Sequence, residues 1–206
     1  MLLLQTVIAN NGGSMIIKNT LGVGLFIIII SVLCQIIDDI SLLNKTSVRA
    51  IVYPQTIEEL QATIKASNGP FSIAGARCSQ GGQTIVADGV VIDMRHLSKI
   101  QHLDVHNKTI TVQTGATWRD IQKFIDPHNL SIKIMQSYSD FSLGGSLSVN
   151  AHGRYIGCGP LIETVRNITI LLANGSLIKA SRTENEALFR AAIGGYGILG
   201  DRKSVV

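Results

Sequence analysis

The sequence has few of the residues that hold structural metals or contact nucleic acids. Its 206 residues include only three cysteines, Cys34, Cys78 and Cys158, which form no C-x-x-C pair and no zinc-ligand spacing with the five histidines. Aromatic residues make up 5% of the chain, and its lysines and arginines form no basic run, although the net charge is +4. Surfaces that stack bases or hold a phosphate backbone need clusters of such side chains. We therefore expect neither a structural metal nor a nucleic-acid partner.

Charged residues are also missing from residues 21–37, a stretch that is almost wholly apolar. As a helix it would span about 26 Å, within the usable range for crossing a bilayer. We expect a transmembrane or signal-anchor helix over 21–37, after an N-terminal segment over 1–20. A cleaved signal peptide is the alternative, but no A-x-A-like site follows the run. Lys18 precedes the run and Asp38 and Asp39 follow it, which favours a membrane-anchored protein whose globular part lies on the outer, periplasmic or extracytoplasmic side.

From Ser47 the pattern changes to short apolar runs separated by turn signals, which predicts a mixture of strands and helices. Residues 48–53, 71–74 and 90–94 are predicted strands, and Thr56 begins a helix with a capping box. This part, about residues 47–102, is expected to form a first small lobe.

A second lobe is predicted over about residues 103–200. Two hairpins are expected, around residues 106–108 and around Asn174-Gly175, because Asn-Gly is a strong two-residue turn signal. Helices are predicted from Thr117 and over 184–193. The fold class is therefore α+β, with two lobes.

A glycine-rich loop within residues 72–84 follows the predicted strand 71–74 and carries no lysine. Gly75, Gly81 and Gly82 allow backbone N–H groups to converge on an anion without interference from a Cβ atom. The loop fits a cradle for a diphosphate, although glycine-rich loops often only turn the chain.

A second glycine pair, Gly144-Gly145, lies at a predicted helix start, where free N–H groups and the helix dipole favour a pyrophosphate. A plain helix cap is the alternative interpretation. If the two glycine segments face one another, they form a diphosphate slot between the lobes. Residues 195–200 also spell G-x-G-x-x-G, but they follow a predicted helix rather than a strand, so we interpret them as a turn.

The order of these parts resembles the FAD-binding domain of the vanillyl-alcohol-oxidase type, also called PCMH-type, and most closely its sugar and aldonolactone oxidase branch. The resemblance covers about residues 47–200. It rests on four segments in the same order: a strand, Pro54, a helix and a strand leading to residues 75–79; residues 115–120; residues 142–153; and the Asn174-Gly175 hairpin followed by residues 188–200.

The resemblance implies a two-lobed PCMH-type FAD-binding domain that belongs to an oxidoreductase acting on CH–OH groups of a sugar, lactone or other alcohol. In that family FAD lies between the lobes and is contacted mostly by backbone groups. The matching cofactor-binding positions are Ala74, Gly75, Ala76, Arg77, Cys78, Ser79, Gln80, Gly81, Gly115, Gly144, Gly145, Ser148, Asn150, His152 and Gly153. His152 either contacts the flavin or supports the turn, and the second role is favoured.

Two departures from the family qualify these expectations. Many relatives carry a histidine that bonds covalently to the flavin at the position of Cys78, so we expect dissociable FAD here. Relatives also continue into an apolar strand and a substrate-binding cap domain, whereas residues 201–206 form a polar tail. The cap domain is therefore expected to be absent unless a partner chain supplies it, and no catalytic residue can be carried over.

The alternative is a non-catalytic remnant or interaction module that no longer holds FAD stably. It is supported by Cys78 and by the unpaired sheet edge expected where the family's last strand would lie.

Overall fold

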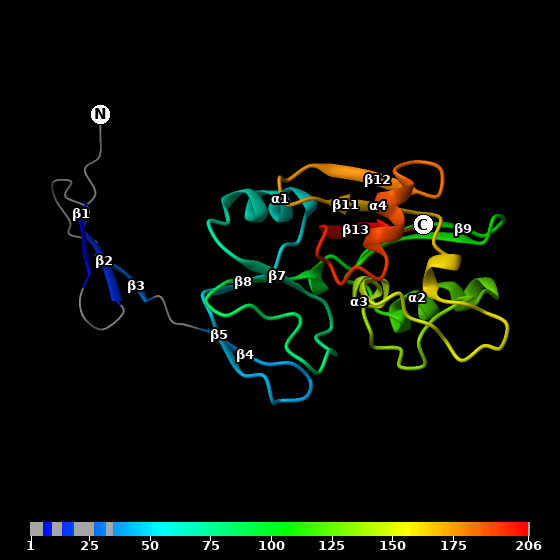
Figure 1. The fold of residues 1–206 in the computed structure, drawn as a ribbon, viewed down its shortest axis with the longest axis horizontal. Coiled ribbons are helices and arrows are strands. Elements are labelled where there is room, and N and C mark those ends of the chain that lie inside the picture. Colours follow the sequence, from blue (N-terminus) through cyan, green and yellow to red (C-terminus); the bar gives the residue numbers. More distant parts are fainter. Residues whose placement is uncertain (1–5, 10–13, 19–26, 32–34, 206) are drawn as a thin grey trace.

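Three short strands at the N-terminal end form an antiparallel sheet of their own (Figure 1). The computed structural model describes residues 6–9, 14–18, 27–31 and 35–205. The strands are β1 (Thr6–Ala9), β2 (Ser14–Lys18) and β3 (Ile27–Ser31). They are followed by β4 (Gln35–Ile37), which pairs with β5 (Thr46–Val48).

The helix predicted over 21–37 is not observed where the structure describes that range. Residues 27–31 and 35–37 are strands, and the remainder of the range lies outside the described residues. The physical reason is that β-branched isoleucines favour extended backbone once a neighbouring strand is there to pair with. Among the described residues, no helix is both long and apolar enough to cross a membrane.

The first lobe is a three-stranded parallel sheet with one crossover helix. The strand order is β6 (Ala50–Val52), β8 (Val90–Asp93), β7 (Phe71–Ala74), and α1 (Ile57–Ala66) connects β6 to β7. The predicted cap of α1 is confirmed, because the Thr56 hydroxyl accepts a hydrogen bond from the Glu59 N–H at 3.1 Å. Ile57, Leu60 and Ile64 recur at helical spacing and are buried, so one face of α1 packs in the core.

The second lobe is a five-stranded antiparallel sheet in the order β12-β11-β13-β10-β9. Its strands are β9 (Ile100–Asp104), β10 (Thr109–Gln113), β11 (Asn167–Leu171), β12 (Leu177–Ser181) and β13 (Asp201–Val205). Its helices are α2 (Trp118–Ile125), α3 (Leu143–Ser148) and α4 (Glu186–Ala192), with short 3₁₀ turns η2 (Asp126–His128) and η3 (Leu161–Glu163). Both predicted hairpins are confirmed, as β9–β10 and β11–β12.

The polar tail predicted over 201–206 is a strand where the structure describes it. β13 lies between β10 and β11 and is antiparallel to both, so the edge that was expected to be unpaired is occupied (Figure 1). The prediction was wrong because side-chain polarity is a weak guide to strands, whereas two facing strands supply backbone partners for almost any sequence.

The two lobes meet closely at Gly115. A Cβ atom at this position would lie 2.0 Å from the carbonyl oxygen of Met94 and 2.7 Å from that of Leu97. The Gly115 N–H also donates to the Leu97 carbonyl at 2.9 Å. Met94 and Leu97 belong to the core cluster of the first lobe, in and after the 3₁₀ turn η1 (Met94–His96). Only glycine allows this backbone contact between the lobes.

Candidate functional site

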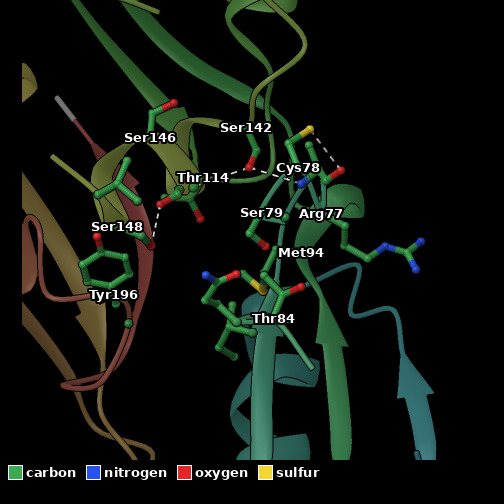
Figure 2. A pocket seen from close by; sticks show the side chains of 18 of the residues that line it. Arg77, Cys78, Ser79, Thr84, Met94, Thr114, Ser142, Ser146, Ser148 and Tyr196 are labelled. Atoms are coloured by element: carbon green, nitrogen blue, oxygen red, sulfur yellow. Dashed lines mark hydrogen bonds between the residues drawn. The ribbon is translucent and has the colours of Figure 1, made fainter. Parts of the chain in front are cut away.

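A cavity of about 660 Å³ lies between the two lobes, a size typical of sites for cofactors and small molecules. One wall is β7 and the loop that follows it. The opposite wall is α3 together with the turn that precedes β13 (Figure 2).

The loop after β7 presents unsatisfied polar groups to this cavity. Arg77 has a left-handed backbone, with φ of 53°, and the N–H groups of Arg77, Cys78 and Ser79 have no acceptor within the described part of the chain. The hydroxyl oxygens of Ser79 and Thr84 are buried and have no partner among the described residues. Buried polar groups normally have partners, and consecutive amides around a left-handed residue form an anion-binding concavity. The loop is therefore built to contact a polar, anionic ligand.

The arginine of this loop serves the fold rather than the cavity. Its side chain points away from the cavity in Figure 2 and forms an ion pair of 3.6 Å with Asp93, which is fully buried at the end of β8. Asp93 also accepts three hydrogen bonds from the Arg95 guanidinium, which raise the pKa of Arg95. The cradle itself consequently consists of backbone amides and hydroxyl groups.

The glycine pair of α3 shapes the opposite wall but offers few free donors. The Gly144 N–H donates to the Thr114 carbonyl at 2.8 Å, and the Gly145 N–H donates to the Ser142 hydroxyl at 3.3 Å. Cβ atoms would lie 3.0 Å from Thr114 Cβ at Gly144 and 2.2 Å from Ser142 Oγ at Gly75. Gly75 thus allows close packing between the walls, whereas Gly144 packs against Thr114 of its own lobe. Because the N–H groups of Gly144 and Gly145 already have acceptors, the interpretation as a plain helix cap fits this pair better than a phosphate site.

Polar side chains on the α3 wall are held by internal hydrogen bonds. The Ser146 hydroxyl accepts from the Trp118 indole N–H at 2.9 Å and donates to the Gln136 side-chain oxygen. The Ser148 hydroxyl donates to the Gly144 carbonyl at 2.9 Å. These bonds fix the orientation of Gln136, Ser146 and Ser148 at the cavity wall.

The structure brings most of the predicted cofactor-binding residues to one cavity and leaves some of them outside it. Those that line it are Gly75, Ala76, Arg77, Cys78, Ser79, Gln80, Gly144, Gly145 and Ser148. Those that do not are Ala74, Gly81, Gly115, Asn150, His152 and Gly153. Ala74 is fully buried in the core, and the His152 Nδ1 lies 3.0 Å from the Gly153 carbonyl oxygen, which fits the structural role favoured for this histidine.

Sequence reasoning missed several lining residues, among them Met94, Gln136 and Tyr196. The segment 195–200 was interpreted as a turn, and it is a turn into β13. Three of its glycines have positive φ or close backbone contacts, and Tyr196, Gly197, Ile198 and Gly200 also line the cavity. A signal existed for this segment, since it is an expected turn and binding residues lie disproportionately on loops.

Cys78 has the properties of an unreactive thiol. Its Sγ donates to the Ala76 carbonyl at 3.4 Å, and burial, assisted by the negative charge of Asp140, raises the pKa of the thiol. Only the thiolate is a good nucleophile, so Cys78 is protonated and weakly reactive near neutral pH. Elsewhere in the described part of the chain, no group of three His, Cys, Asp or Glu residues could hold a metal ion.

Residues 48–181 match the family model described as "FAD binding domain". The chain belongs to this FAD-binding domain family. The expected PCMH-type resemblance is thereby confirmed, and FAD is the cofactor that the family binds.

Known members of the FAD-binding domain family are 26–29% identical to the chain over the aligned residues. It is 28% identical over 150 residues to L-gulonolactone oxidase from Bos taurus, covering 71% of the chain and 34% of that enzyme. It is 29% identical over 154 residues to D-arabinono-1,4-lactone oxidase from Yarrowia lipolytica, covering 71% of the chain and 29% of that enzyme. It is 26% identical over 164 residues to cytokinin dehydrogenase 2 from Oryza sativa, covering 73% of the chain and 29% of that enzyme. The chain thus spans about a third of the length of these relatives.

The cavity fits the FAD that the family binds. Unpartnered hydroxyls at Ser79 and Thr84, together with the amides of residues 77–79, provide donors for an anionic diphosphate. Ile73, Met94 and Val149 add apolar surface to the same cavity, as an aromatic ring system requires.

Proposed function

We propose that the chain is the FAD-binding part of a flavin-dependent oxidoreductase that acts on a CH–OH group of a sugar, a lactone or another alcohol. The observation that carries the proposal is the inter-lobe cavity with its buried, unpartnered hydroxyls and free loop amides. The substrate class is supported by two relatives whose names state that they oxidise lactones. Bound FAD would supply the two-electron acceptor. The described residues bind and orient it.

We propose that the residues that bind the substrate lie outside the described cavity walls. Because the chain spans about a third of its relatives, we propose that a substrate-binding cap acts together with it, either in the same polypeptide or from a partner chain. The exposed apolar side chains of Tyr196 and Ile198, which lie at the cavity, are consistent with a covering element there.

We further propose that FAD is held without a covalent bond. Cys78 stands at the position where the resemblance places a flavin-linked histidine, and its raised thiol pKa disfavours the thiolate that a bond to the flavin would need.

Titration of the purified protein with FAD, followed by acid precipitation, tests FAD binding and the absence of a covalent bond. We expect quenching of flavin fluorescence with micromolar or tighter affinity, and release of all flavin into the supernatant on acid precipitation. Ser79→Ala is expected to weaken binding about fivefold to tenfold, because a buried hydrogen bond to the ligand is worth about 1 kcal/mol. Ser98→Ala is the matched control, since Ser98 is exposed and lies outside the cavity, and should bind as the wild type does.

A protein that takes up no FAD would favour the alternative, a non-catalytic remnant or interaction module. One of the two observations behind that alternative, an unpaired sheet edge, does not hold, since β13 occupies that position. Flavin that remained with the acid precipitate would instead contradict the non-covalent mode alone.

Membrane attachment through residues 21–37, with the globular part on the outer side, is also a proposal. It is supported by 17 consecutive uncharged residues. We expect the expressed chain to stay in the membrane fraction after washing at alkaline pH, and a variant lacking residues 1–34 to be released. Recovery of the whole chain in the wash would contradict attachment.

A further inference from the structure

A short loop before β5, residues 38–44, lies against the proposed flavin-binding loop. It is outside residues 48–181, the range that matches the family model. Three hydrogen bonds join the two loops. The Ile40 N–H donates to the Arg77 carbonyl at 3.2 Å, the Asn44 amide donates to the Gln80 carbonyl at 3.1 Å, and the Gly82 N–H donates to the Asp39 carboxylate at 2.8 Å.

Asp39 is the centre of this arrangement. Its residue surface is only 3% exposed, and its two carboxylate oxygens accept four hydrogen bonds. Oδ1 accepts from the N–H and the hydroxyl of Ser41, and Oδ2 accepts from the side-chain amide of Asn44 and the N–H of Gly82. These bonds hold the pKa of Asp39 below its usual value, and the bond from the Ser41 hydroxyl has the largest effect. Asp39 therefore stays ionised and keeps both oxygens as acceptors.

The flavin-binding loop needs such support because it has no regular secondary structure of its own. Residues 75–84 lie between β7 and β8 without a helix or strand, and Gly82 is left-handed, with φ of 69°. At its start, the loop is fixed by the Ala76 N–H, which donates to the Ser142 hydroxyl at 3.3 Å. Towards its end it is fixed by Asp39 and Asn44. Between these points lie Cys78 and Ser79, whose amides face no internal acceptor.

We propose that Asp39 is a positioning residue of the flavin-binding loop: it holds Gly82 and thereby presents the amides of residues 77–79 in the conformation that binds the FAD diphosphate. The proposal rests on FAD binding as the proposed function. Asp39 does not line the cavity, so it acts through the loop and not by contact with the cofactor.

Asp39→Asn is the sharpest test. The substitution keeps the size of the side chain but replaces one acceptor oxygen with an NH₂ group, so the side chain can no longer accept both from Ser41 and from the Gly82 and Asn44 donors. Asp38→Asn is the matched control, because among the described residues Asp38 accepts only from the N–H groups of Asp39 and Asn44, within its own loop. We expect the affinity for FAD to fall about tenfold or more in Asp39→Asn and to change less than about twofold in Asp38→Asn.

Amide hydrogen exchange of the protein without FAD gives a second readout that does not depend on cofactor binding. Exchange in peptides covering residues 76–82 should be faster in Asp39→Asn than in the wild type and unchanged in Asp38→Asn, while exchange in α1 and β11 stays the same. If the wild type binds no FAD, the proposed function fails, and this measurement still decides whether Asp39 holds the loop.

Wild-type FAD affinity in Asp39→Asn would overturn the proposal, and so would equal losses in both variants. If Asp39→Asn does not fold, Asn44→Ala replaces it, since it removes the bonds to Asp39 and to the Gln80 carbonyl. We expect that variant to lose FAD affinity about threefold to tenfold, and an unchanged affinity would overturn the proposal equally.

Discussion

Gly115→Ala is expected to lower the free energy of unfolding by about 3 kcal/mol, a large part of the stability of a domain this size. The new methyl group would lie 2.0 Å from the Met94 carbonyl oxygen and 2.7 Å from that of Leu97. Both atoms belong to the backbone, so neither can turn away as a side chain would. Relief requires the two lobes to separate at their junction, which also opens the cavity. Thermal or urea unfolding measures the loss, and flavin titration measures its effect on the site.

Gly145→Ala is the matched control for this prediction. It is the same change in the same lobe, but its new methyl group would meet only the Ser142 hydroxyl, at 3.1 Å. Gly145 lies within α3, where alanine is favoured over glycine by about 1 kcal/mol. We expect unchanged or slightly higher stability. If Gly115→Ala were as stable as Gly145→Ala, the close approach of the lobes at Gly115 would not be a requirement of the fold.

Asp93→Asn is expected to cost about 2–3 kcal/mol of stability and to weaken FAD binding. Asp93 is fully buried and is the shared partner of two arginines, at 3.6 Å from Arg77 and 2.7 Å from Arg95. Removing its charge leaves the partly buried guanidinium of Arg77 without a counter-charge, which is the costly way to break a buried ion pair. Arg77 belongs to the flavin-binding loop, so the cavity should change as well. Chemical unfolding and flavin titration together measure both effects.

Asp140→Asn separates this prediction from a general effect of charge. Asp140 pairs with Arg119 at 2.5 Å, but the two side chains are 43% and 51% exposed. Water screens such pairs, and they contribute little to stability. Comparable losses in the two variants would mean that burial of Asp93 has no special role.

Local patterns in the sequence predicted the elements whose causes are local. The N-caps predicted at Thr56 and Thr117 begin α1 and α2, and the Asn174-Gly175 turn joins β11 and β12, with Gly175 at φ of 81°. Each of these signals lies within a few residues of the element it specifies, so the element can be predicted without knowledge of distant contacts. The order of the glycine-rich segments likewise led to the FAD-binding family and to most of the residues that line one wall of the cavity.

Contacts between distant segments decided what the sequence pattern could not. β13 is a strand because β10 and β11 leave a place between them, and the isoleucines of β3 are extended because β2 pairs with them. Arg77 turns to Asp93 and away from the cavity, and Asp39 holds Gly82 across 43 residues of chain. The glycines of α3 pack against Thr114 and Ser142 of their own lobe, and their N–H groups donate to these two residues. Residue type and spacing therefore established the family and the cofactor, whereas which polar groups remain free to meet that cofactor depended on hydrogen bonds that exist only once the lobes have come together.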